Sequence, residues 1–158
     1  MNKRASTVEM CCVMLLLFLF GASTCAMFVA GYESFGRMNK LQDDCLNTRV
    51  AMNYVSMHIR RADVSRAVRV EDSTLGTILT LSEDIEGESY ETRIYLHNGY
   101  LKESFVSAET PFDEEYGFEI IQLDSFGIRR ENNMIVIEIS RGVDKRSMKL
   151  ALRAGVDV

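Results

Sequence analysis

Charged residues are missing from one stretch near the N-terminus, and this gap is the strongest feature of the hydrophobic pattern. From Met10 to Tyr32 the chain has 23 consecutive residues without a charge. At about 1.5 Å per residue, a helix of that length crosses a hydrocarbon core of roughly 30 Å. The pattern therefore predicts a leader at residues 1–9, a transmembrane helix at 10–32 and a separate domain at 33–158.

The charges on the two sides of the apolar segment predict its orientation. Lys3 and Arg4 precede the segment, whereas its long C-terminal side begins with Glu33. Positive charge is retained on the cytoplasmic side of membranes. We therefore expect a single-pass protein of the cell membrane, with a cytoplasmic N-terminus and an extracytoplasmic C-terminal domain.

Two processed forms are alternatives to a retained membrane helix. Residues 24–26 resemble the small-residue site of a signal peptidase, and residues 22–25 loosely resemble a lipoprotein site. A signal peptide needs only about 7 to 15 apolar residues. Because this apolar run continues through residues 27–29, its length favours a helix that stays attached to the protein.

After the apolar run, the spacing of apolar positions becomes that of an amphipathic helix. Alternating steps of four and three define one stripe: Leu41, Cys45, Thr48, Met52, Val55, Ile59 and Ala62. No Pro interrupts this stretch, so we expect a helix over about 33–63. Its side chains Leu41, Met52, Val55 and Ile59 are expected to pack on a sheet. A dimeric coiled coil is the alternative, although three heptads are barely enough for one.

From residue 67 to about 154, short β-rich runs separated by turn residues replace the helical spacing. Helical periodicity does not return. An antiparallel sheet covered on one face by the preceding helix is an α+β fold. The sequence therefore predicts a long N-terminal helix that continues into an amphipathic helix packed on an antiparallel sheet.

Two turn motifs predict the register of two hairpins. Asn98-Gly99 is typical of a type I′ turn, in which both central residues have positive φ. A two-residue turn at this position pairs Leu96 with Leu101 and Ile94 with Glu103. The second of these pairs sets a carboxylate opposite an apolar side chain, so we expect that face to be only partly buried.

The second hairpin is predicted at Asn132-Asn133. A two-residue turn there pairs Ile128 with Ile137 and Phe126 with Ile139, so register and hydrophobic pattern agree. The segment 147–153 alternates apolar and basic residues and predicts one further strand at the end of the sheet.

The longest irregular stretch of the sheet region is "SAETPFDEEYG" at residues 107–117. It contains the only proline of the chain, Pro111, with Phe112 and Tyr116 beside it. Binding residues are concentrated on loops that a rigid scaffold positions. We therefore name Pro111, Phe112 and Tyr116 as a candidate interaction loop.

Charge and cysteine content limit the function classes. Without Lys3 and Arg4 the 18 bases become 16, and without Glu9 the 23 acids become 22, so the domain after the membrane carries a net charge of −6. This balance disfavours nucleic acid as a partner. Three of the four cysteines lie within the apolar run, which leaves Cys45 alone and excludes a disulfide within the domain.

No residue pattern predicts catalysis, a metal site or a cofactor. The two histidines, His58 and His97, have no nucleophile in a local motif, and we interpret them as a packed helix residue and a turn neighbour. The acids of segment 83–88 lack the spacing of an EF-hand, so a solvated turn is favoured over a calcium site. We expect a protein that is not an enzyme, and the sequence identifies no small-molecule substrate.

Glu9 is the one candidate assembly residue. It lies at the start of the apolar run, where an ionised carboxylate without a partner is costly. Its side chain either reaches the cytoplasmic headgroups or meets an amino group on an adjacent copy as helices pack into a bundle. The second arrangement would set the axial register of the bundle.

The order of these features resembles the type IV pilins and pseudopilins: a basic leader, a Glu, an uninterrupted apolar helix, and a domain of helix then sheet. The resemblance implies that Glu9 neutralises the N-terminal ammonium of a neighbouring subunit. It also implies a cut by a prepilin peptidase. A cut between Arg4 and Ala5 makes Glu9 the fifth residue, as in that family, but sets Arg4 where the family has Gly or Ala; a cut after Ala5 makes Glu9 the fourth.

The domain after the membrane is similar to a family of small single-span proteins of Gram-positive bacteria, the domain of unknown function 4860. The segments that carry this similarity are "NTRVAMNYVSMHIRRADV" at 47–64 and "YETRIYLHNGYLKESF" at 90–105. The resemblance implies a minor pilin-like subunit associated with type II secretion or type IV pilus assembly. Its partners would be the membrane, other pilin-like subunits and assembly platform proteins. The alternative is a permanently anchored extracytoplasmic domain that binds or senses a ligand.

Overall fold

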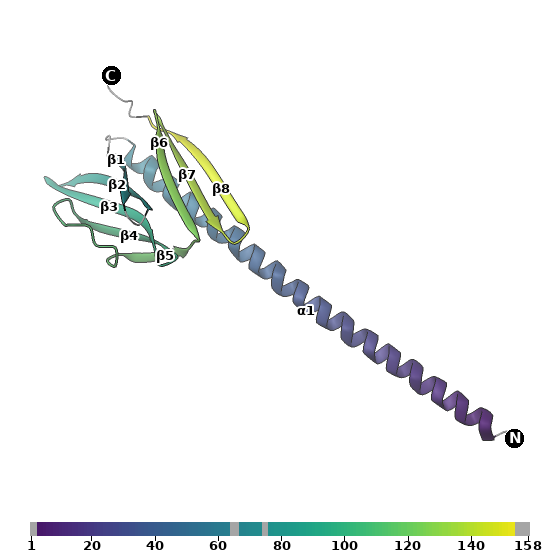
Figure 1. Cartoon of the computed structure of the whole chain (residues 1–158). Coiled ribbons are helices and arrows are strands. Elements are labelled where there is room, and N and C mark those ends of the chain that lie inside the picture. Colours follow the sequence, from purple (N-terminus) through teal and green to yellow (C-terminus); the bar gives the residue numbers. More distant parts are fainter. Residues whose placement is uncertain (1–2, 64–66, 74–75, 154–158) are drawn as a thin grey trace. The chain divides into compact units, whose positions relative to one another are not determined.

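The computed structural model describes residues 3–63, 67–73 and 76–153, and these form one helix followed by eight strands. The expected leader residues 1–2 and the expected strand end at residue 154 lie outside these ranges. The elements are α1 (Lys3–Ala62), β1 (Val68–Ser73), β2 (Gly76–Ile85), β3 (Glu88–His97), β4 (Tyr100–Ser107), β5 (Phe118–Gln122), β6 (Ser125–Glu131), β7 (Met134–Arg141) and β8 (Asp144–Ala151). One long N-terminal helix and antiparallel strands confirm the predicted α+β class (Figure 1).

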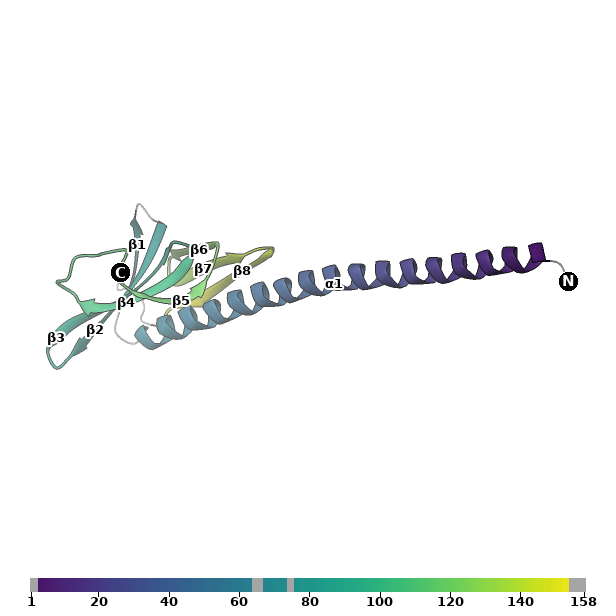
Figure 2. The same cartoon turned by 90° about the horizontal axis from the view of Figure 1, so that it is seen from below.

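The chain forms two compact units, Met1–Lys40 and Leu41–Val158. The first unit contains the apolar part of α1. We call the second unit the head; it contains the remaining turns of α1 and all the strands described. Figure 2 shows that α1 is a single helix along its described length.

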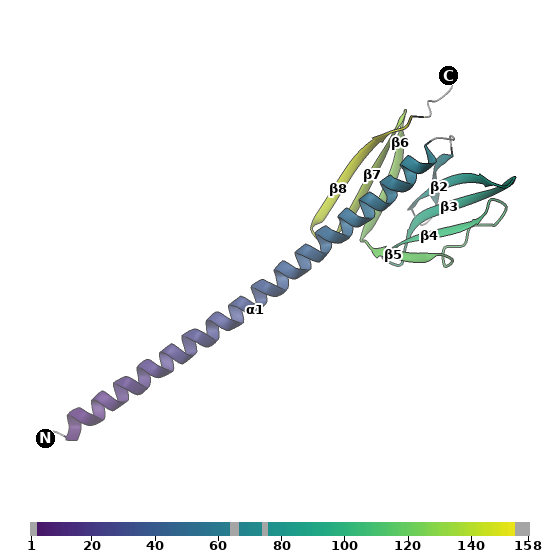
Figure 3. The ribbon, with the colours of Figure 1, turned by 180° about the vertical axis from the view of Figure 1, so that it is seen from behind.

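The strands of the head lie in two antiparallel sheets, where the sequence pattern alone predicted one. One sheet has the order β1-β2-β3-β4-β5 and the other has the order β6-β7-β8. Both sheets lie on the same side of the head part of α1 (Figures 1 and 3). The chain changes sheets at Leu123 and Asp124: Leu123 N donates to Gly99 O at 2.9 Å, whereas Asp124 N donates to Ser140 O at 2.9 Å. The consecutive strands β5 and β6 therefore belong to different sheets.

Both predicted hairpins are confirmed in register. β3 and β4 pair Leu96 with Leu101 and Ile94 with Glu103, and the turn residues Asn98 and Gly99 have φ of 52° and 77°. Positive φ at both positions is what a type I′ turn requires.

β6 and β7 pair Ile128 with Ile137 and Phe126 with Ile139, as predicted. These four side chains are 0–8% exposed, and they form part of the head's core. The strand predicted over 147–153 is found as the second half of β8.

One stripe of α1 closes the core over both sheets. Ala51, Met52, Val55 and Ile59 are 0–3% exposed and belong to the same cluster as the inward-facing residues of the two sheets. The sheet residues of this cluster include Leu79, Leu81, Ile94, Leu101, Ile135, Ile137, Ile139 and Leu150. Burial of a large aliphatic side chain contributes roughly 1.5–3 kcal/mol, so the head is held together mainly by this apolar layer.

The structure differs from the expected packing stripe at its first residues. Leu41 is 46% exposed and Cys45 is also exposed, so neither belongs to the buried stripe that closes the core. The first buried residue of the helix is Asp44, at 6% exposure. Leu41 and Cys45 have the correct helical spacing, but the face of α1 that meets the strands at this turn is the one that carries Asp44.

Candidate functional site

The apolar part of α1 is exposed on every face. Each large apolar side chain from Val8 to Phe35 is at least 55% exposed, and Glu9 among them is exposed as well. In the described part of the chain, α1 is the single helix long and apolar enough to cross a membrane. An apolar helix of this length near the N-terminus suggests a membrane anchor. The expected assembly residue Glu9 therefore lies on an uncovered apolar surface.

The expected interaction loop lies over the face of the first sheet that points away from the core. We call residues 108–117, which join β4 to β5, the acidic loop. Tyr95 is buried but is not part of the core cluster, because alternation along β3 directs it to the opposite face from Ile94. Its hydroxyl donates to Tyr116 O, and its ring meets Phe112 edge-on with centroids 5.0 Å apart.

Two cations of the sheet also hold the acidic loop. Arg93 Nη2 donates to Thr110 O at 3.0 Å, and Lys102 Nζ donates to Glu115 O at 3.3 Å. Lys102 is only 8% exposed, so the loop covers a charged side chain that would otherwise be in contact with water. Pro111 and Tyr116 stay exposed while the loop backbone is anchored. The loop is thus a fixed surface feature.

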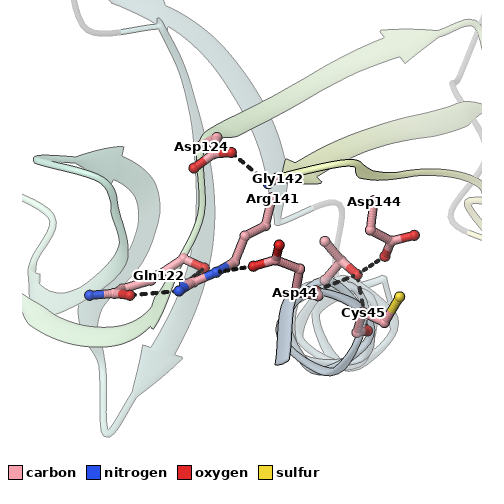
Figure 4. Close-up of polar contacts among 8 residues, drawn as sticks. Asp44, Cys45, Gln122, Asp124, Arg141, Gly142 and Asp144 are labelled. Carbon is pink, nitrogen blue, oxygen red and sulfur yellow. Dashed lines mark hydrogen bonds and ion pairs between the residues drawn. The ribbon is translucent and has the colours of Figure 1, made fainter. Parts of the chain in front are cut away.

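A polar seam joins the first buried turn of α1 to the corner between the sheets (Figure 4). Arg141 Nε donates to Asp44 Oδ1 at 3.1 Å, while its other two nitrogens donate to Gln122 O at 2.8 Å and Gln122 Oε1 at 2.7 Å. The Gly142 N–H donates to Asp124 Oδ2 at 2.7 Å. One guanidinium therefore binds the helix, the end of β5 and the start of the β7–β8 turn together.

Gly142 is required at this seam for two reasons. Its φ of 55° lies in the left-handed region, where a side chain costs energy. A Cβ atom at Gly142 would also lie 2.2 Å from Asp44 Oδ2 and 3.0 Å from Asp44 Cγ. The Asp44 carboxylate can reach Arg141 only because the turn has no side chain at this position.

A second polar contact lies one turn further along α1. Thr48 Oγ1 donates to Asp144 Oδ2, and Arg146 Nε donates to Asp144 Oδ2 at 2.8 Å and to Thr48 Oγ1 at 3.1 Å. The hydrogen bond from Thr48, with the one from Arg146, lowers the pKa of Asp144 below its ordinary range. The carboxylate therefore stays ionised and keeps the start of β8 on the helix.

A third polar cluster surrounds Glu103, the carboxylate that lies opposite Ile94 in the β3–β4 hairpin. The Tyr54 hydroxyl donates to Glu103 Oε2, and His58 Nε2 lies 3.8 Å from the same oxygen. The rings of Tyr54 and His58 are 4.6 Å apart. Glu103 is therefore partnered by two side chains of α1 at the edge of the apolar layer.

Burial shifts both titratable groups of this cluster toward their neutral forms. Desolvation raises the pKa of Glu103. Desolvation lowers the pKa of His58, with a further lowering from Arg61 that is opposed by Glu83. At 3.8 Å, His58 Nε2 is too far from Glu103 Oε2 for a hydrogen bond, and the Tyr54 hydroxyl already donates to that oxygen. These contacts match a structural role.

The described residues contain no group of three or more His, Cys, Asp or Glu side chains that could hold a metal ion. The acids of segment 83–88 surround the β2–β3 turn, where Asp84 Oδ1 accepts from Gly87 N at 3.0 Å. His97 lies beside the β3–β4 turn, 2.9 Å from Asn98 Nδ2. The four cysteines are free and exposed.

Sequence reasoning missed the Asp44–Arg141 seam. One signal was present: Asp44 and Thr48 are four residues apart, in helical phase with Ala51, Val55 and Ile59. A polar residue in phase with a buried stripe indicates a buried partner. The identity of that partner could not be read locally, because Arg141 lies 97 residues away in the sequence.

Comparison with known proteins gives one match. The sequence model of the family described as Domain of unknown function (DUF4860) matches residues 46–142. This range contains the packed turns of α1, strands β1–β7 and the Asn98-Gly99 and Asn132-Asn133 turns. No curated protein and no solved structure matches the chain.

Proposed function

The chain belongs to the DUF4860 family, and from that premise we propose that it is a non-enzymatic, membrane-anchored subunit of a type IV pilus or type II secretion-like assembly machine. In this proposal it is a minor pilin-like or pseudopilin-like subunit. The membrane stores it before assembly, and other pilin-like subunits and platform proteins are its partners. Its activity is contact between subunits, without turnover of a substrate.

The observation that carries the proposal is the division of one helix into two environments. α1 is continuous from Lys3 to Ala62, yet its large apolar side chains are exposed up to Phe35 and its apolar stripe is buried from Ala51 onward. A helix that is apolar on every face must be surrounded by lipid or by other helices. In a subunit that moves from the bilayer into a helical bundle, the apolar part of α1 is surrounded first by lipid and then by other helices.

Glu9 supports a bundle more than a permanent lipid environment. It is the one charged residue between Thr7 and Tyr32, and it lies among exposed apolar side chains. A carboxylate at the border of hydrocarbon is costly unless a cation neutralises it or it reaches the headgroups. An amino group supplied by a neighbouring copy would compensate that cost only in the assembled state, so assembly would be favoured.

The orientation and the state of the leader are parts of the same proposal. A cytoplasmic N-terminus and an outside head are supported by Lys3 and Arg4, because positive charge is retained on the cytoplasmic side of membranes. Processing would remove a few N-terminal residues and keep the apolar run. Intact-mass measurement of the membrane-extracted protein tests this, and retention of residue 1 would argue against processing.

Exchange of Glu9 for Gln is the direct test of assembly. We expect the substitution to reduce recovery of chemically cross-linked oligomers from membranes by at least about tenfold, because it removes one partner of a desolvated charge pair. Membrane insertion, measured by resistance to carbonate extraction, should not change. The matched control is Glu33→Gln, which neutralises a carboxylate just beyond the other end of the apolar run.

The outcomes separate the two roles of Glu9. Equal oligomer recovery in the wild type and the Glu9→Gln protein would mean that Glu9 only reaches the headgroups. Equal loss in the Glu9→Gln and Glu33→Gln proteins would indicate a general effect of charge near the membrane.

A second candidate function, a permanently anchored binding or sensing domain, is favoured by the acidic loop. Its backbone is held by Arg93, Tyr95 and Lys102 while Tyr116 remains 64% exposed. Deletion of residues 109–115 should then abolish binding of a partner with the sheets intact. Unchanged binding would exclude the loop from that function.

A further inference from the structure

Strand β8 is an edge strand of the three-stranded sheet, since it pairs with β7 alone in the described sheet order. Just beyond it, Leu152 N donates to Asn133 O at 2.9 Å, so residues in phase with Leu152 direct their N–H groups toward β7. In an antiparallel ladder the alternate residues face the other way. The N–H groups of Lys145, Ser147 and Lys149 therefore point to an open edge.

The open edge is basic in an acidic protein. The whole chain has a net charge of −5, but segment 144–153 has the cations Lys145, Arg146, Lys149 and Arg153 against the single acid Asp144. Arg146 is matched by Asp144 at 2.8 Å, and Lys149 pairs with Glu131 at 3.3 Å. Within the described ranges no ion pair engages Lys145, so positive charge remains available at this end of β8.

A groove of about 610 Å³ lies beside this end of β8, between the strand and α1. Met52 and Met148 line it together with the cations Arg49, Lys145 and Arg146. Arg49 is exposed and, like Lys145, takes part in no ion pair among the described residues. We call this surface the β8 groove. This lining of two methionine thioethers and three cations suits an aromatic side chain that is flanked by carboxylates.

The positive charge of the β8 groove disfavours binding of a second β8 groove. Two β8 edges brought together would set like charges opposite each other, which is destabilising. A symmetric contact between two grooves is therefore disfavoured. The partner surface must be acidic and must differ from the groove itself.

The acidic loop has this chemistry. Glu109, Asp113, Glu114 and Glu115 lie in it without a base, and none of them forms an ion pair with a side chain that the structure describes. Tyr116 is 64% exposed, and Phe118 directly after the loop is 81% exposed. The contacts from Tyr95 and Lys102 hold the loop backbone in place, so little conformational entropy would be lost on binding.

We propose that the acidic loop of one copy binds the β8 groove of a second copy of this chain. The loop joins β4 to β5 of the first sheet, and the groove lies beside β8, the edge strand of the second sheet. The β4–β5 connection and β8 lie on opposite sides of the head (Figures 1 and 3). The contact is therefore heterologous, and each bound copy leaves one loop and one groove free for the next. The inference rests on the proposed function because it names the partner in the assembly as another copy.

The β2–β3 turn is the competing acidic surface of the head. It carries four acids, Glu83, Asp84, Glu86 and Glu88, but no aromatic residue lies between residues 83 and 88. The turn therefore offers negative charge but no aromatic side chain that could contact Met52 and Met148 in the β8 groove. This turn gives a matched control for the effect of charge alone.

Charge reversal in the full chain, extracted in detergent micelles, tests the proposal. The groove variant is Arg49→Glu with Lys145→Glu, and the loop variant is Glu114→Lys with Glu115→Lys. Each variant alone repels its own copies, so we expect co-purification of two differently tagged copies to fall at least about tenfold. A mixture of the groove variant and the loop variant should restore it, because each then offers the complement of the other.

The control variant, Glu86→Lys with Glu88→Lys, should co-purify as the wild type does. The proposal is overturned if the mixture fails to restore association, or if the control variant lowers association as much as the loop variant. Near-UV circular dichroism checks that each variant is folded.

The Glu9→Gln protein separates this inference from the proposed function. Association that is lost in Glu9→Gln but unchanged in both charge variants leaves the proposed function standing and overturns the inference. Association that depends on the groove and the loop but is the same in Glu9→Gln supports the inference and argues against the role of Glu9.

Discussion

The two parts of α1 differ in the exposure of their apolar side chains, although they belong to one helix. In the first part every large apolar side chain from Val8 to Phe35 is at least 55% exposed. In the second part the apolar side chains Ala51, Met52, Val55 and Ile59 are at most 3% exposed. The first part is apolar on all faces, whereas the second is apolar on one stripe.

This difference shows what stabilises each part. The second part is buried against two sheets of the same chain, so its side chains contribute to the free energy of unfolding of the head. The large apolar side chains of the first part are exposed, so they contribute little to that free energy. Substitutions in the two parts should therefore change different measurements.

The largest expected effect is on the core. Ile59→Ala should lower the free energy of unfolding of the head by about 3 kcal/mol, because it leaves a cavity between α1 and the sheets. Leu17→Ala removes an aliphatic side chain of the same size from the exposed part of the same helix, and should change it by less than about 0.5 kcal/mol. Urea denaturation of the full chain in micelles, followed by near-UV circular dichroism, measures both. Equal losses would mean that the two parts unfold as one unit.

The polar seam should come next. Gly142→Ala sets a Cβ atom against the Asp44 carboxylate at a φ of 55°. We expect the free energy of unfolding of the head to fall by about 2 to 3 kcal/mol. The matched control is Gly127→Ala in β6, where a Cβ atom would meet nothing closer than 3.9 Å and φ is not positive. That substitution should be neutral or slightly stabilising. If both substitutions change the free energy of unfolding equally in the same denaturation experiment, the polar seam does not stabilise the head.

The Tyr54–His58–Glu103 cluster should give a smaller effect that depends on pH. Because its pKa is raised, folded Glu103 holds a proton more tightly than the unfolded chain does, and its ionisation lowers stability as pH rises above the ordinary value of 4.5. Glu103→Gln removes this loss and should stabilise the head near neutral pH, with no gain well below pH 4.5. Melting temperatures from pH 3 to 8 test this prediction.

His58 is the counterpart with the opposite sign. Its pKa is lowered in the folded state, so the unfolded chain binds the proton more readily and stability falls as pH drops below 6.5. His58→Gln should flatten the pH dependence on that acidic side and leave the alkaline side unchanged. An unaltered slope below pH 6.5 would mean that another group causes the acid sensitivity.

The smallest expected effect is at Leu41, where the structure differs from the predicted packing stripe. Leu41 is 46% exposed, so Leu41→Ala should change the free energy of unfolding by less than about 0.5 kcal/mol. Met52→Ala, at 3% exposure in the same helix, should cost about 2 kcal/mol or more. A large loss at Leu41 would indicate a contact absent from the isolated chain, such as one with a neighbouring copy.

The sequence by itself determined the features that depend on near neighbours. The uncharged run from Met10 to Tyr32 sets the apolar part of the helix, and the four-and-three spacing sets the buried stripe from Met52 to Ile59. Turn chemistry at Asn98-Gly99, together with strand alternation, was sufficient for the β3–β4 register. These signals are local because backbone geometry repeats every two or 3.6 residues.

Only the tertiary structure decided how these elements meet. The division of the strands into two sheets depends on Leu123 N and Asp124 N bonding to different strands, and no local pattern marks that corner. The burial of Asp44 in place of Leu41 depends on Arg141, 97 residues away. A charged residue is stable in a buried turn only when a partner of opposite charge is brought to it, and folding of the whole head brings that partner.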